Sequence, residues 1–284
     1  MREIESTENL TGKNKVHIHD FADVSPMAEL GKGVYVGSGA VIGPDVIVGQ
    51  NTWIGPNVII EGRVKIGSNN KIFPGACIGL EPQDLKYKGD CTEVLIGDNN
   101  IFRECVTINR ATFEGEKTII GSKNLLMAYS HLGHNCEIGN NVVIANSVQI
   151  AGHVVIEDRA VIGGCLGIHQ FVHIGYLSMV GGMTRVDRDV PPYCLVEGHP
   201  GRMRGLNKVG IKRKNIDKDN KEEYLQLKRI WNLLFKSDHV IYDGLKIARQ
   251  ERLLQPSSRL CDFLDLSIAR GRRGPMPYLI STNK

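Results

Sequence analysis

The chain has 284 residues with 42% hydrophobic and 23% charged residues, a globular composition that excludes wholesale disorder. Its formal net charge of +4 is too small to indicate a nucleic-acid groove, so we expect no nucleic-acid partner. It has neither a signal-peptide pattern nor an apolar run long enough to span a bilayer, and its seven cysteines form no C-x-x-C pair. We therefore expect a cytoplasmic protein with reduced thiols and no membrane span.

After an N-terminal segment, residues 1–17, the sequence repeats with a period of six. An aliphatic or aromatic residue recurs at every sixth position from Ile18 to Ile78 and, after an interruption, from Ile96 onward, with a further gap before Ile120. The position four residues later is in most hexads small or β-branched, and glycine often follows the aliphatic directly. This pattern predicts short flat strands joined by sharp corners. Because such a unit cannot bury its apolar row alone, the units must stack as a solenoid.

The period resembles that of the hexapeptide-repeat family, whose left-handed parallel β-helix has three hexads in each coil. The resemblance implies an all-β left-handed parallel β-helix (hexapeptide-repeat solenoid) over residues 18–189. The hexads that contain His134, His153 and His169 begin eighteen residues apart, so these histidines should lie on one face of consecutive coils, with His131 at the adjoining corner. One such histidine alone would more often be a solvated corner residue, but the convergence of four favours a functional site.

A charged loop near residues 80–93 interrupts the repeat. Loops on rigid solenoids often carry function. Asp84 and Lys86 in this loop have the groups to hydrogen-bond a hydroxylated or phosphorylated ligand. The alternative is that they are ordinary solvated loop charges.

The six-residue period stops at Val190. We expect residues 190–214 to form a connecting segment, whose basic run suits phosphate or an acidic protein. A helical period over residues 215–270 then predicts a small α-helical C-terminal domain. Residues 271–284 are expected to form a flexible tail.

Five motifs carry a more specific resemblance: QDLKY at 83–87, GSKNLLMAYSHLGHNCEIGN at 121–140, IAGHVVI at 150–156, GIHQFVHIG at 167–175 and DVPPY at 189–193. Together they resemble the UDP-N-acetylglucosamine O-acyltransferases of lipid A biosynthesis, over residues 16 to about 270. The resemblance implies transfer of a (3-hydroxy)acyl chain from acyl carrier protein to the 3-hydroxyl of UDP-N-acetylglucosamine. It also implies a homotrimer and no cofactor or metal.

The resemblance assigns roles to individual residues. His134 would be the general base, because an imidazole titrates near the working pH, and the Gly152 N–H would stabilise the oxyanion. The repeat count independently places Gly152 one coil above His134. Contacts to the sugar and phosphates, or their support, fall on Asp84, Lys86, His131, His153, His169 and Gln170, and nucleotide contacts on Asn207 and Arg213.

Gly182 matches the position at which the acyl groove of this family is open or blocked. Three coils, about 14 Å, separate it from the level of Ala128, just before the His131 corner. A glycine there implies an open groove and a preference for long acyl chains.

The sequence departs from the family pattern at Asn135, where some relatives carry an aspartate, at Asn109, where others have a histidine, and at Val209, where a glutamate helps to bind nucleotide. Two other functions fit the repeat. A γ-class carbonic anhydrase-like hydrase would hold zinc on three histidines of adjacent subunits, and a non-catalytic β-helix scaffold would give no reason for the histidines to converge.

Overall fold

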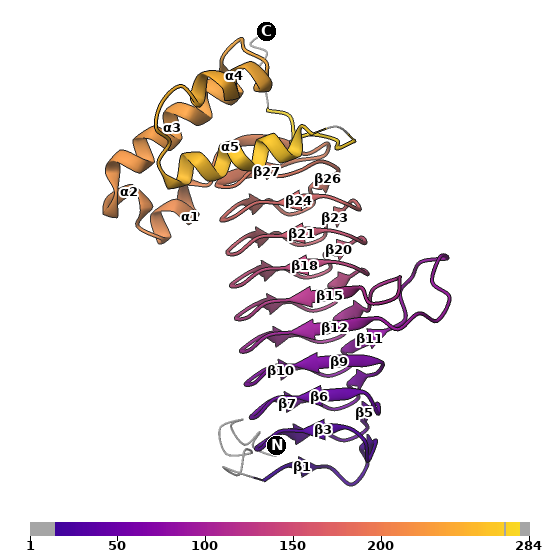
Figure 1. Ribbon diagram of the computed structural model, residues 1–284. Coiled ribbons are helices and arrows are strands. Elements are labelled where there is room, and N and C mark those ends of the chain that lie inside the picture. Colours follow the sequence, from indigo (N-terminus) through magenta and orange to yellow (C-terminus); the bar gives the residue numbers. More distant parts are fainter. Residues whose placement is uncertain (1–14, 270, 279–284) are drawn as a thin grey trace.

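The computed structural model (Figure 1) describes residues 15–269 and 271–278. Most of the predicted N-terminal segment, 1–17, and the end of the predicted tail, 271–284, lie outside the described residues. Short strands wind into a tall solenoid with three parallel sheets, and helices stand at its C-terminal end. The predicted β-helix followed by a small helical region is thus confirmed.

Consecutive strands enter the three sheets in turn, so each sheet collects every third strand. Sheet A contains β1 His17–Ile18, β4 Tyr35–Val36, β7 Trp53–Ile54, β10 Lys71–Ile72, β13 Ile101–Phe102, β16 Leu125–Leu126, β19 Val143–Ile144, β22 Val161–Ile162, β25 Met179–Val180, β27 Cys194–Glu197 and β28 Arg202–Leu206. Sheet B contains β2 Asp23–Val24, β5 Val41–Ile42, β8 Ile59–Ile60, β11 Cys77–Leu80, β14 Thr107–Asn109, β17 His131–Leu132, β20 Gln149–Ile150, β23 Gly167–Ile168 and β26 Arg185–Val186. Sheet C contains β3 Glu29–Leu30, β6 Val46–Val48, β9 Arg63–Ile66, β12 Glu93–Ile96, β15 Lys117–Ile120, β18 Glu137–Ile138, β21 Val155–Ile156 and β24 His173–Ile174.

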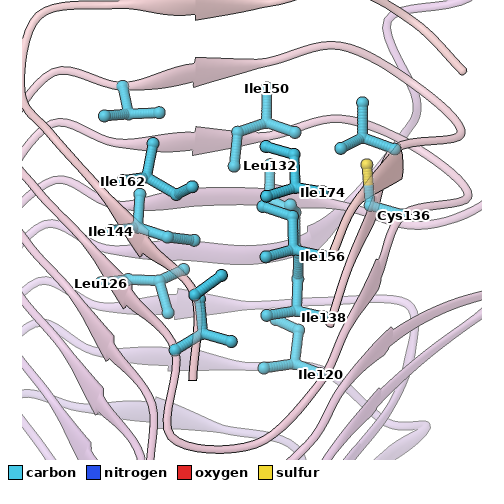
Figure 2. Close-up of a cluster of buried hydrophobic side chains, with 14 of the residues drawn as sticks. Ile120, Leu126, Leu132, Cys136, Ile138, Ile144, Ile150, Ile156, Ile162 and Ile174 are labelled. Atoms are coloured by element: carbon cyan, nitrogen blue, oxygen red, sulfur yellow. The ribbon is translucent and has the colours of Figure 1, made fainter. Parts of the chain in front are cut away.

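The register agrees with the repeat. In sheet B, Leu132 pairs with Ile150 and Ile150 with Ile168, so one coil is three hexads long. These side chains point inward and stack with their counterparts from the other sheets into one continuous core (Figure 2). The backbone bonds run between coils, and the apolar row of each coil is covered by the next.

Most corners contain a turn in which one residue adopts a left-handed backbone. Asn51, Asn57 and Asn141 occupy such positions with φ near +56°, because asparagine tolerates this conformation better than most residues. His153 and Asn135, with φ of 60° and 61°, occupy equivalent corners. The corner geometry therefore fixes the direction in which these two side chains leave the backbone.

The helices are α1 Lys208–Arg213, α2 Ile216–Asp219, α3 Lys221–Lys236, α4 Ile241–Ala248 and α5 Gln255–Ser267. Apolar faces of α3, α4 and α5 pack together, with Leu227, Trp231 and Leu264 among the buried residues. The helix α5 also contacts the β-helix, where Phe263 lies 4.6 Å from the ring of His173. In the part of the chain that the structure describes, every helix is too short or too polar to cross a membrane.

Residues 190–214, which we predicted as a connecting segment, contain a β-hairpin and a short helix. Strand β27 extends sheet A and pairs antiparallel with β28, and α1 follows directly. Val196 and Met203 are buried in this hairpin, which closes the open end of the core. A six-residue period cannot reveal it, because an antiparallel hairpin follows a different spacing.

The described part of the expected tail is also ordered. Pro275 forms a bridge with Asp189, and Tyr278 with Met203. The Arg272 guanidinium lies 2.9 Å from both carboxylate oxygens of the nearly buried Asp189. Residues 271–278 are therefore held on the last coils, because the buried carboxylate needs a cationic partner.

Candidate active site

Both interruptions of the repeat leave the β-helix at the corner between sheets B and C. The predicted loop lies between β11 and β12, and a second loop, residues 110–116, lies between β14 and β15. They project together from the side of the solenoid (Figure 1). His134 follows β17 at the same corner in the next coil. The two loops therefore overhang the predicted general base.

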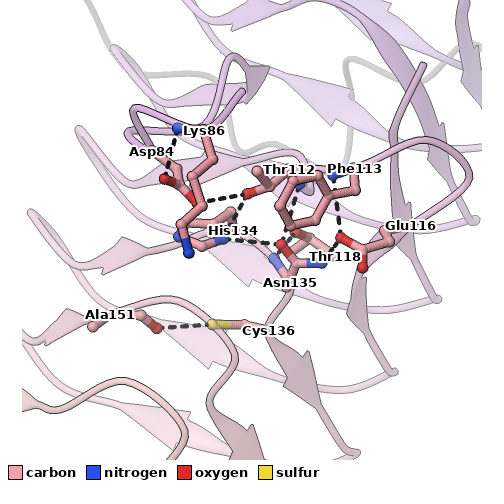
Figure 3. A network of polar contacts seen from close by, with 10 residues as sticks. All are labelled: Asp84, Lys86, Thr112, Phe113, Glu116, Thr118, His134, Asn135, Cys136 and Ala151. Carbon is pink, nitrogen blue, oxygen red and sulfur yellow. Dashed lines mark hydrogen bonds and ion pairs between the residues drawn. The ribbon is translucent and has the colours of Figure 1, made fainter. Parts of the chain in front are cut away.

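The His134 side chain is 15% exposed and stands in a polar network (Figure 3). Its Nδ1 lies 2.9 Å from Thr112 Oγ1 and 2.9 Å from Asn135 Oδ1. Its Nε2 lies 3.9 Å from Asp84 Oδ2. The His153 ring approaches edge-on at 5.1 Å and stacks in turn on Phe171 at 4.7 Å. Of the histidines predicted to converge, His134 and His153 are thus in contact in a single chain, and Asp84 lies beside them.

The network assigns the His134 tautomer. Asn135 Oδ1 already accepts the Thr112 N–H at 3.1 Å, and an amide oxygen can only accept hydrogen bonds. Thr112 Oγ1 donates to Asp84 Oδ2 at 3.3 Å, so its lone pairs face the imidazole. Both neighbours of Nδ1 are acceptors, and we assign the imidazole proton to Nδ1. Nε2 then carries a free lone pair.

Gly152 lies against that free nitrogen, as the repeat count predicted. A Cβ atom added at Gly152 would lie 2.4 Å from His134 Nε2, so any side chain would displace the ring. Among the described residues, no acceptor is bonded to the Gly152 N–H. The corner therefore places the imidazole Nε2 and an unused amide donor side by side.

Burial and neighbouring charges adjust the groups around His134. Burial, together with the proximity of His134, lowers the pKa of both His131 and His153, so these imidazoles are neutral near pH 7. The Lys86 backbone N–H bonds Asp84 at 3.0 Å and lowers the pKa of that carboxyl despite desolvation. Burial raises the pKa of the nearby Cys136 thiol to about 12, so it stays protonated and is no nucleophile.

A shallow groove runs from this corner across the outer face of sheet B. It has a volume of about 390 Å³ and is lined by His131, Gln149, Gly167 and Arg185, among others. His131 Nδ1 lies 2.8 Å from Thr107 Oγ1, which holds the imidazole at the groove wall. An added Cβ at Gly167 would meet no atom within 4 Å, so the groove stays wide one coil above Gln149.

Comparison with known proteins gives a consistent result. A family model described as "Udp N-acetylglucosamine O-acyltransferase; Domain 2" matches residues 189–276, and a bacterial transferase hexapeptide model matches 45–79 and 117–152. The acyl-[acyl-carrier-protein]--UDP-N-acetylglucosamine O-acyltransferase of Gloeothece citriformis is 51% identical over 76% of this chain and 78% of its own length. The Helicobacter pylori (strain Shi470) protein of the same name is 43% identical over 88% and 92%. The structure of LpxA from Acinetobacter baumannii superposes with a TM-score of 0.85 at 37% identity, covering 91% of this chain and 99% of that chain.

The chain belongs to the UDP-N-acetylglucosamine O-acyltransferase family.

Membership of the acyltransferase family decides against the carbonic anhydrase and scaffold alternatives.

Several residues expected at the site do not contact His134 in this single chain. His169 and Gln170 lie two coils above the level of His134, where His169 lines the same groove as His131 and its Nε2 is 3.2 Å from Arg273 Nη2. Asn207 is 8% exposed. Its side chain caps α1 and donates to the Leu177 carbonyl at 2.9 Å.

Asn207 therefore lies at the edge of sheet A that faces sheet C, and Arg213 ends the helix that it caps. Gly182 lies at the other edge of sheet A, at the corner that leads to sheet B. The single chain thus separates these three residues from the His134 corner.

Sequence reasoning missed the second loop and its side chains. Arg110 donates to Tyr87 Oη at 2.8 Å and to the Gly79 carbonyl at 2.9 Å, and so clamps the first loop. Asn109 donates to the Glu81 carbonyl at 2.7 Å, which gives that departure from the family pattern a structural role. The missing hexad between Ile108 and Ile120 was the available signal.

Proposed function

We propose that this family member transfers a (3-hydroxy)acyl chain from acyl carrier protein to the 3-hydroxyl of UDP-N-acetylglucosamine, the first step of lipid A biosynthesis. The observation that carries the proposal is the placement of His134 Nε2, to which we assign the lone pair, beside the Gly152 backbone, in a chain 51% identical to an enzyme of that name. A cytoplasmic location fits the expected carrier and nucleotide-sugar substrates.

The reaction needs a base and an oxyanion donor, and the corner offers both. His134 Nε2 takes the proton of the sugar 3-hydroxyl as its oxygen attacks the thioester carbonyl. The Gly152 N–H bonds the negative oxygen of the tetrahedral intermediate. When the intermediate collapses, the carbon–sulfur bond breaks, the ester remains on the sugar, and the imidazolium returns the proton to the carrier thiolate. These steps call for no cofactor and no metal.

Asp84 and Lys86 sit at the entrance to this corner. Asp84 keeps its carboxylate at 3.9 Å from His134 Nε2, close enough for one sugar to contact both groups. Lys86 is exposed, and its ammonium is free to bond a sugar hydroxyl or a phosphate. We propose that this pair orients the acceptor sugar and that the neutral imidazole of His153 lines the site beside it.

Replacing His134 by alanine should abolish acyl transfer without unfolding the protein. Loss of a general base typically costs about 10²–10⁴-fold in rate, and the corner side chain contributes little to the apolar core. The measurement is turnover of UDP-N-acetylglucosamine with acyl carrier protein thioesters, followed by mass analysis. Wild-type turnover in this variant would overturn the assignment of the base.

Gly152→Ala should also lose most of its turnover, because the new methyl group would collide with His134 Nε2. Gly43→Ala is the matched control, since the nearest atom to its added Cβ is at an ordinary 3.4 Å in a distant coil at an equivalent corner. Both variants should show wild-type thermal unfolding within a few degrees. Equal turnover in the two variants would contradict the placement of the reacting atoms at Gly152.

The remaining expected residues require a second copy of the chain. Gly182 and Asn207 flank the two edges of sheet A, whose outer face carries an apolar ladder of Ile101, Leu125, Val143, Val161 and Met179. We propose a homotrimer in which sheet A of one copy packs against the His134 corner of the next. Such head-to-tail contacts close a ring of identical subunits and would bring Asn207, Arg213 and Gly182 to the site.

Light scattering should give the mass of three chains at working concentration. Val143→Asp, which places a charge in the middle of the ladder, should yield smaller species with little turnover, whereas Lys65→Asp on the outer face of sheet C should leave the trimer intact. A monomeric and fully active wild-type protein would contradict the arrangement.

Gly182 is proposed to set the acyl length. An added Cβ would meet only the Gly164 backbone, with its carbonyl oxygen at 3.3 Å and its nitrogen at 3.8 Å, and no side chain lies within 4 Å. Gly182→Met should shift selectivity toward shorter donors, because each methylene denied burial forfeits about 0.8 kcal/mol. The control is Ser38→Met, at the same corner near the other end of the β-helix. The test measures turnover with a series of acyl donors of increasing chain length. An unchanged order of preference in Gly182→Met would show that this position does not set the acyl length.

A further inference from the structure

Glu116 stands behind the His134 network, on the second loop. Its side chain is half-buried, and its Oε2 accepts two hydrogen bonds, from Asn135 Nδ2 at 2.7 Å and from the Phe113 N–H at 3.2 Å (Figure 3). It makes no bond to His134. Its influence on the imidazole therefore passes through the amide of Asn135.

The two ends of the Asn135 amide are distinguished by their partners. The NH₂ group faces the Glu116 carboxylate, and the oxygen faces both the Thr112 N–H and His134 Nδ1. The Asn135 backbone is fixed as well, because its N–H donates to Thr118 Oγ1 at 2.9 Å. A rotated amide would place its oxygen against the carboxylate and its NH₂ against Nδ1.

We propose that Glu116 is a positioning residue for acyl transfer: by holding the NH₂ of Asn135 it keeps the amide oxygen on His134 Nδ1, and so keeps Nε2 unprotonated toward the acceptor hydroxyl. The inference rests on the proposed role of His134 as general base. In this chain the residue after the proposed base is Asn135, whose side chain is an amide and not a carboxylate. The neighbouring loop contributes the carboxylate instead, from Glu116.

Physical reasoning gives this relay two effects. The first is the tautomer, since a rotated amide would favour the proton on Nε2 and leave no lone pair for the sugar hydroxyl. The second is charge, because a carboxylate acting through a polarised amide stabilises the imidazolium that forms during attack. The other charged or titratable groups around His134 are Asp84, Lys86, His131, His153 and the Cys136 thiol, and none of their side chains bonds the amide of Asn135.

The experiment compares Glu116→Gln, Glu116→Ala and the exchange variant Glu116→Gln/Asn135→Asp with the wild-type protein. Turnover and the pH dependence of kcat/KM are measured with UDP-N-acetylglucosamine and an acyl carrier protein thioester. Glu114→Gln is the matched control: it lies in the same loop, its Oε2 accepts the Cys91 N–H at 2.7 Å, and it does not contact the His134 network. His134→Ala is run alongside.

Glu116→Ala should lower kcat by about 10-fold or more, because the catalytic rate falls when the tautomer of the histidine is no longer fixed. KM for UDP-N-acetylglucosamine should change less than about 2-fold. Glu116→Gln should retain more activity and move the acidic limb of kcat/KM to lower pH, because removing a negative charge makes the imidazole less basic. Glu114→Gln should leave both quantities at their wild-type values.

The exchange variant tests the relay itself. Its new carboxylate at position 135 accepts directly from Nδ1–H, and its new amide at position 116 donates to that carboxylate. It should recover kcat to within about 3-fold of wild type, whereas Asn135→Asp alone brings two carboxylates together and should be slower. If Glu116 had a purely structural role, its replacement would change the stability of the protein. It would not shift the acidic limb of kcat/KM, and the exchange variant would not recover kcat.

The outcomes separate the two levels of inference. Wild-type kcat and an unmoved pH limb in Glu116→Ala, with an inactive His134→Ala, would overturn the relay and leave the base assignment intact. An exchange variant no faster than Asn135→Asp would also overturn the relay. Wild-type activity in His134→Ala would instead overturn the proposed base, whatever Glu116 does.

Discussion

The eighteen-residue coil is the constraint on which the rest of this molecule depends. Each coil buries its aliphatic row only by lying under the next, and hydrogen bonds between parallel strands hold the coils in fixed register. A slip by one residue would turn the inward row outward. Residues separated by whole coils are therefore held in line, and the solenoid acts as a rigid frame for side chains at its corners.

The candidate site is built where that frame is interrupted. Two insertions leave the same corner, and their side chains bond one another as well as the solenoid. Arg110 clamps the first loop, and Thr112 joins Asp84 to His134. The rigid corner thus carries polar loop side chains that already have hydrogen-bond partners. This arrangement is what a preorganised acid–base site requires, because little reorganisation is left for the reaction itself.

Electrostatics at the corner separates the histidines by their surroundings. Burial keeps His131 and His153 neutral, while Asp84 remains ionised because a backbone N–H holds its charge. His134 differs from both in that Thr112 Oγ1 and Asn135 Oδ1 both contact its Nδ1, while its Nε2 faces Gly152 and Asp84. Three identical side chains in one small region thus differ through their hydrogen-bond partners and burial.

The sequence by itself determined the solenoid, its register and the alignment of Gly152 with His134. A six-residue apolar period admits few other ways to bury a core, and residues one coil apart must then be neighbours. It also indicated the first loop as functional, and motif resemblance indicated the family. The helical end followed from a change of period.

Only the tertiary structure decided the contacts that do not follow the period. The hairpin β27–β28, the docking of residues 271–278 and the second loop all depend on partners far away in sequence. The contacts of Thr112 and Glu116 arise because two insertions of different length meet at one corner, and the repeat carries no signal for how their side chains pack. Asn207 illustrates the same limit, since its engagement in capping α1 depends on the folded backbone around it. Periodicity fixes what recurs along the chain, whereas insertions and ends take their structure from the three-dimensional contacts they happen to make.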